Sequence, residues 1–131
     1  MSEESRVPVR DIQARTLAYA VRAVRLYQAL QESRDGAAWV IGKQFLRSAT
    51  SIGANIAEAQ SAESPADFVH KYGIAQKEAR ETDYWLSLME ASDLLSEARL
   101  APLRQETNEI TVIITTIIVN KKKSMRSNGQ P

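Results

Sequence analysis

Two carboxylates, Glu78 and Glu81, stand three residues apart in a stretch where apolar residues recur at helical spacing. Residues three apart lie on the same face of a helix, so the pair could contribute ligands to a metal ion. A di-metal helical bundle, however, needs Glu-x-x-His motifs on facing helices, and the only histidine of the chain is His70. The sequence therefore predicts no metal and no cofactor.

Catalytic motifs are also missing from the sequence. His70 is expected near the start of a helix as a partly exposed surface residue, and there is no cysteine to supply a thiolate. The sequence contains no glycine-rich phosphate loop and no nucleophile motif. We therefore expect a protein that is not an enzyme.

Arg47 is the candidate partner for an ion pair with these carboxylates. If residues 37–61 and 65–92 form an antiparallel hairpin, facing positions have numbers that sum to about 127. Arg47 then lies within reach of Glu78 or Glu81, and Asn55 lies opposite Tyr72. Such a cluster is either a half-buried network that fixes the register of the helices or a binding site on the bundle wall, and we favour the first interpretation.

The elements that would position these residues are four helices. Apolar residues recur at steps of three and four in four segments, and Ser64-Pro65 is a strong helix start. The fourth segment is rich in β-branched residues, but a lone strand would have no partner. We predict an all-α, up-down-up-down antiparallel four-helix bundle with helices over about residues 9–33, 37–61, 65–92 and 97–123.

The helical spacing also predicts which residues form the core. The first helix carries two apolar stripes that cannot both face one narrow seam. In the second helix, Gly53 and its small neighbours indicate a close approach by another helix. The stripes of the first helix are Leu17, Val21, Val24 and Ile12, Tyr19, Ala23, Leu26, Leu30; the seam of the fourth is Leu103, Thr107, Ile110, Ile114, Ile117.

Composition sets the broad class. The chain has 131 residues, of which 44% are apolar and 25% are charged, and its net charge is +1, as expected for one globular domain. The N-terminus lacks the apolar core of a signal peptide, and the apolar run 110–119 is too short to span a bilayer. We expect a cytoplasmic protein without a membrane partner, organised as an N-terminal arm (1–8), a bundle domain (9–123) and a disordered basic tail (124–131).

Cations gather in two places that are candidates for contact with nucleic acid. Residues 120–131 contain four cations and no acid, although lysines also favour the negative end of a helix dipole and help solubility. The first helix adds three arginines to its surface. The candidate residues are Arg15, Arg22, Arg25, Lys121, Lys122, Lys123 and Arg126.

The segment 44–68, QFLRSATSIGANIAEAQSAESPADF, resembles the signature of a bacterial four-helix-bundle family related to proteins encoded in intervening sequences of 23S ribosomal RNA genes. The segment 71–90 is similar to the third helix of that family. The chain departs from the usual pattern at Ala59, where the family often has glycine, and at the start of the second helix. The matching polar residues are Gln44, Arg47, Ser48, Ser51, Asn55 and Glu58, followed by Glu78 and Glu81.

The resemblance implies a homo-oligomer in the form of a pentameric ring. A related protein, the accessory variability determinant of diversity-generating retroelements, binds nucleic acid and a reverse transcriptase through such a ring. Two hypotheses follow for this chain: a non-enzymatic oligomer that binds RNA or DNA without base specificity, and a scaffold that presents a groove to a protein partner.

Overall fold

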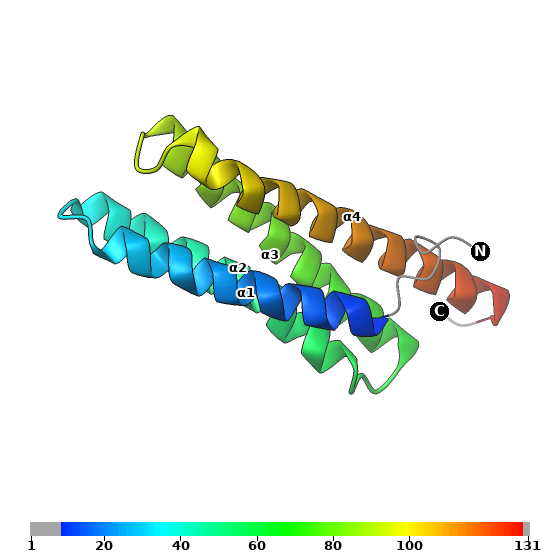
Figure 1. The fold of residues 1–131 in the computed structure, drawn as a ribbon. Coiled ribbons are helices and arrows are strands. Elements are labelled where there is room, and N and C mark those ends of the chain that lie inside the picture. The colour runs from blue at the N-terminus through cyan, green and yellow to red at the C-terminus, as the bar shows by residue number, and fades with distance from the viewer. Residues whose placement is uncertain (1–8, 130–131) are drawn as a thin grey trace.

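The computed structural model describes residues 9–129, and these residues form four α-helices and no strand. The expected fold is confirmed as an all-α four-helix bundle (Figure 1). The N-terminal arm, residues 1–8, lies outside the described residues. The helices are α1 (Val9–Gln31), α2 (Gly36–Ala59), α3 (Pro65–Ala91) and α4 (Glu97–Ser127).

Three helices begin at a side-chain cap. The Ser64 side chain accepts from the backbone N–H of Asp67, and Pro65 occupies the first turn of α3, as the sequence predicts. The Asp35 side chain caps the N-terminus of α2 by accepting from the backbone N–H of Ala37. Ser96 does the same for α4. The short links between the helices therefore have defined ends.

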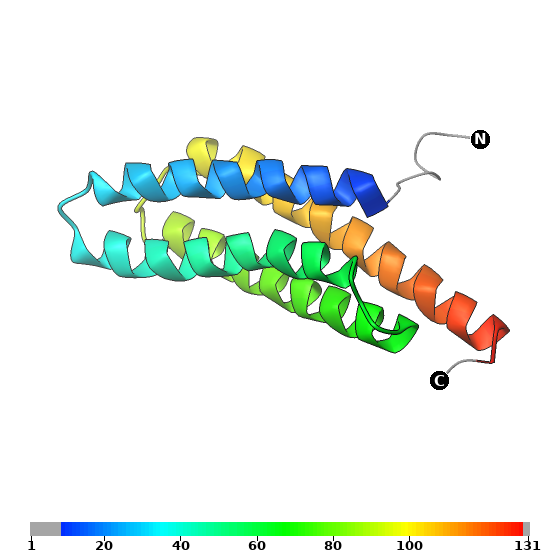
Figure 2. The ribbon, with the colours of Figure 1, turned by 90° about the horizontal axis from the view of Figure 1, so that it is seen from below.

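Successive helices pack side by side, whereas α1 and α4 share a less extensive contact. Figures 1 and 2 show why: α4 crosses the bundle obliquely and its last turns extend beyond the start of α1. The α4 helix has 31 residues against 23 in α1, so part of α4 has no α1 residue beside it.

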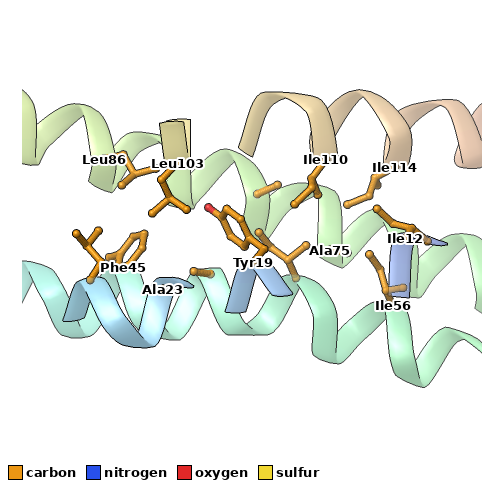
Figure 3. Close-up of a cluster of buried hydrophobic side chains, with 14 of the residues drawn as sticks. Ile12, Tyr19, Ala23, Phe45, Ile56, Ala75, Leu86, Leu103, Ile110 and Ile114 are labelled. Carbon is orange, nitrogen blue, oxygen red and sulfur yellow. The ribbon is translucent and has the colours of Figure 1, made fainter. Parts of the chain in front are cut away.

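The core contains apolar side chains from all four helices, including two buried tyrosines, Tyr19 and Tyr72, and Figure 3 shows Tyr19 within it. Tyr19 of α1 is almost fully buried, and its hydroxyl shares a 2.6 Å hydrogen bond with Thr107 of α4. A buried hydroxyl without a partner would cost stability, so this pair fixes where α1 meets α4. The buried stripe of α1 is Ile12, Tyr19, Ala23, Leu26 and Leu30.

The second apolar stripe of α1 is therefore the one that lies outside the core. Leu17, Val21 and Val24 are 68%, 43% and 40% exposed. In α4, the predicted seam is wrong at its last step, because Ile118 is buried in place of Ile117. The oblique course of α4 moves its contact line round the helix by one residue at that point.

The boundary that the sequence places at residue 123 is also wrong. The helix α4 continues to Ser127, so residues 124–127 are helical. Met125 is 7% exposed and lies seven residues after the buried Ile118, a spacing that keeps both on one side of the helix. Its burial extends the helix through the basic segment. No helix within residues 9–129 is long and apolar enough to cross a membrane.

Gly53 allows α1 and α2 to approach closely, as the small residues of α2 predict. A Cβ atom added at Gly53 would lie 3.2 Å from Thr16 Oγ1 and 3.4 Å from the carbonyl oxygen of Thr16. Most side chains would therefore push α1 away from α2.

Candidate functional site

Arg47 joins α2 to both carboxylates of α3. Its Nη1 donates to Glu78 Oε2 at 3.1 Å, and its Nη2 donates to Glu81 Oε2. The Glu78 side chain is only 12% exposed, whereas the Arg47 side chain is 50% exposed. The ion pairs predicted from the facing positions of the two helices are confirmed.

Two residues outside the predicted polar motif, Trp85 and Thr82, complete this cluster. Trp85 donates from Nε1 to Glu81 Oε2 at 3.3 Å, and the Thr82 hydroxyl lies 2.8 Å from Ser48 Oγ inside the interface. Ser48 in turn donates to the carbonyl oxygen of Phe45. The position of Trp85, four residues after Glu81, was a signal in the sequence, because such residues are neighbours on a helix.

The rest of the polar motif does not join this cluster. Ser51 Oγ donates to the carbonyl oxygen of Arg47, and Asn55 Nδ2 donates to the carbonyl oxygen of Ser51. Gln44 and Glu58 are exposed, and their side chains make no hydrogen bond to another described residue. The motif thus divides into one interhelical ion-pair cluster and a set of bonds within α2.

The cluster is suited to holding two helices in register. Both carboxylates are occupied by one guanidinium, and within residues 9–129 no group of three or more acidic or histidine side chains could hold a metal ion. A partly buried ion pair with further hydrogen bonds specifies a unique alignment more than it adds stability. His70 is exposed on α3, apart from these groups.

The end of α4 carries the basic candidates on an ordered helix. Lys122, Lys123 and Arg126 are exposed. Lys121 differs, because its Nζ lies 5.1 Å from the centre of the Phe68 ring, a cation–π distance. Three of the four predicted cations of α4 are therefore directed to solvent. The fourth, Lys121, packs against α3.

Arg15, which the sequence marks as a candidate nucleic-acid contact, forms ion pairs with two carboxylates of α4. It donates to Glu106 through Nε and Nη2 at 2.8 and 2.7 Å, and also to Glu109. The hydrogen bond from Arg15 lowers the pKa of Glu106, against a smaller opposing effect of burial. Arg15 thus links α1 to α4, which leaves Arg22 and Arg25 as the exposed arginines of α1 in the predicted set.

An apolar groove runs between α1 and α2. Leu17 and Ala20 of α1 face Gly53, Ala54 and Ala57 of α2 across it. The small residues of α2 leave the groove open, and the exposed Leu17 forms its rim. Of the exposed α1 stripe, Leu17 is the residue that lines this groove.

Comparison with known proteins places the chain in a family. The model of the family described as 23S rRNA-intervening sequence protein matches residues 11–116. The chain belongs to this family. It is also similar to the crystal structure of a protein of unknown function from the S23 ribosomal protein family of Bacteroides thetaiotaomicron VPI-5482. The two share 41% identity with a TM-score of 0.78, over 82% of this chain and 97% of the other.

The solved relative therefore shares the bundle over nearly its whole length. No match to a curated protein was found. The match to the family covers the ion-pair cluster and the groove, and it ends before the basic residues 121–126.

Proposed function

We propose that this member of the 23S rRNA-intervening sequence protein family is a non-enzymatic homo-oligomer that binds RNA or DNA through phosphate contacts, without base specificity. The observation that carries the proposal is the end of α4, where Lys122, Lys123 and Arg126 are exposed on a helix that has no acidic residue after Glu109. Nucleic acid is bound chiefly through its phosphates by such cations.

Binding of nucleic acid through these cations requires several copies of the chain, because one chain has a net charge of only +1. A ring of copies, five as the family resemblance implies, would present the α4 cations several times, with Arg22 and Arg25 adding to each copy. Affinity that depends on many phosphate contacts falls steeply with salt. A nucleic-acid partner also agrees with the cytoplasmic location expected from the sequence.

Charge substitution tests this proposal better than truncation, since removal of residues after 120 would also remove the buried Met125. The test variant is Lys122→Gln/Lys123→Gln/Arg126→Gln. The matched control is Arg34→Gln/Lys43→Gln/Arg99→Gln, which removes three exposed cations from other parts of the surface. Fluorescence anisotropy with structured RNA and duplex DNA at about 50 and about 200 mM salt should show weaker binding for the test variant alone.

The second candidate is a protein-interaction scaffold, and the α1–α2 groove is the observation that favours it. If the wild-type protein shows no anisotropy change with RNA or DNA at low salt, the scaffold hypothesis becomes the better one.

A further inference from the structure

The outward side of α3 carries a stripe of cationic and aromatic side chains. His70, Gly73, Lys77, Arg80 and Tyr84 follow one another at steps of three and four, which places them on one side of the helix. All but Gly73 are exposed, and Tyr84 is 59% exposed. No carboxylate belongs to this stripe.

The carboxylates of α3 all have a salt-bridge partner, although Arg47 and Arg104 each serve two of them, whereas two cations of α3 have no such partner within residues 9–129. Each of the five carboxylates of α3 has a cation within salt-bridge distance: Asp67 with Lys71, Glu78 and Glu81 with Arg47, and Asp83 and Glu90 with Arg104. Lys77 and Arg80 form no salt bridge with any other residue of the described range. The stripe therefore presents positive charge that the fold itself does not use.

Tyr84 provides a flat aromatic surface beside these cations. Its ring meets the Trp85 ring edge to face, with centroids 5.2 Å apart and an interplanar angle of 74°. One helical turn separates Arg80 from Tyr84 and two turns separate Lys77 from it, or about 6 and about 10 Å along the axis. An aromatic ring with adjacent cations suits a nucleobase and the phosphates next to it.

We propose that this α3 stripe binds single-stranded nucleic acid, with one base stacked on Tyr84 and neighbouring phosphates held by Arg80 and Lys77. The inference rests on the proposed function and deepens it by naming the substrate class, a strand with unpaired bases. In a duplex the base faces are stacked inside the helix, so a side chain on a helix surface reaches them only where the strand is open. The stripe shares no residue with the α1–α2 groove.

The test compares variants of Tyr84 in the full chain. Anisotropy with a short labelled oligothymidylate should show binding weakened by about 5- to 100-fold for Tyr84→Ser, the range that loss of one stacked base predicts. Tyr84→Phe keeps the ring and should bind like wild type. Because Tyr84 is exposed, both variants should keep the melting temperature of the wild-type protein.

The contributions of base stacking and of phosphate contacts can be measured separately. With an oligonucleotide that has abasic sites throughout, Tyr84→Ser and wild type should bind equally, because no base is left to stack. Lys77→Gln/Arg80→Gln should lower the slope of log affinity against log salt by about 0.7 for each lost contact, the value for single strands. The pair Arg34→Gln/Lys43→Gln, two exposed cations outside α3, should leave that slope unchanged.

Two results would overturn the inference in different ways. If the protein binds oligothymidylate and Tyr84→Ser and Lys77→Gln/Arg80→Gln bind like wild type, the α3 stripe is not the site, although the proposed function stands. If wild type binds neither the oligonucleotide nor structured RNA nor duplex DNA, the proposed function and this inference both fail.

Discussion

Arg47 is half exposed, yet it is the ion-pair partner of Glu78, which is mostly buried. Arg47→Ala should lower the free energy of unfolding by about 1–2 kcal/mol, since it leaves the Glu78 carboxylate without a cation while solvent screens part of the loss. Gln44→Ala, one turn earlier on an exposed position, should change it by less than about 0.5 kcal/mol. Urea unfolding measures both. Equal stability of Arg47→Ala and wild type would show that the pair is not structural and would favour a ligand contact.

The Arg15–Glu106 pair makes stability depend on pH in a defined direction. The pKa of Glu106 is lowered from its ordinary value of 4.5, chiefly by the hydrogen bond from Arg15. A carboxyl whose pKa is lower in the folded state stabilises the fold above its unfolded pKa and loses that effect as pH falls through the folded pKa. Arg15→Gln should therefore melt below wild type at pH 7.

The difference in melting temperature between Arg15→Gln and wild type should shrink as the pH falls below about 4.5, where Glu106 becomes protonated in the unfolded chain and then in the folded protein. Thermal melts in a series of buffers would measure it. A difference that stays constant down to acid pH would mean that Arg15 acts through packing of its aliphatic part.

At the scale of the helices, two glycines with different surroundings test whether α1 and α2 depend on close approach. Gly73 has no atom within 4 Å of an added Cβ, whereas Gly53 would place one 3.2 Å from Thr16 Oγ1. Gly73→Ala should stabilise the protein by about 0.5–1 kcal/mol, the usual gain in a helix interior. Gly53→Ala should gain less or lose stability. Equal gains, measured by thermal melting, would show that the α1–α2 interface adapts freely.

Much of the bundle was predictable because its signals are local. Ser64-Pro65 determined the start of α3, and the facing positions of an antiparallel hairpin gave the partners of Arg47. The predictions that were wrong depended on the position of a partner helix. The two α1 stripes are both apolar, and only the course of α2 and α4 decides that Leu17 is exposed. Likewise, the burial of Met125 follows from its spacing after Ile118, and the predicted seam contained Ile117 instead of Ile118.

The candidate site was predictable in part for the same reason. Glu78 and Glu81 interrupt an apolar line, which marked them in the sequence. The ion pair between Arg15 and Glu106 could not be predicted from apolar spacing, because α1 and α4 are far apart in the chain and cross obliquely. Interactions between distant helices require the crossing geometry, which apolar spacing alone does not contain.

At the scale of the whole molecule, the exposed apolar residues form two sets, which we propose as the contacts between copies of the chain. One set surrounds the α1–α2 groove and includes Leu17, and another lies on α4 and includes Val112, which is 64% exposed. Contact between two different surfaces of successive copies is head-to-tail and closes into a ring when the rotation permits. Exposed apolar surface of this kind usually marks an interaction site.

Light scattering should therefore show a species several times the 14.6 kDa of one chain. Leu17→Asp and Val112→Asp should each shift that species toward the monomer, because a carboxylate in an apolar contact loses its hydration without a partner. Val40→Asp is a matched control, since Val40 is 65% exposed but is not a lining residue of the groove. If wild type is a monomer at micromolar concentration, the assembly is refuted. The nucleic-acid proposal is weakened with it, because a single chain with a net charge of +1 lacks the repeated cations on which phosphate binding would depend.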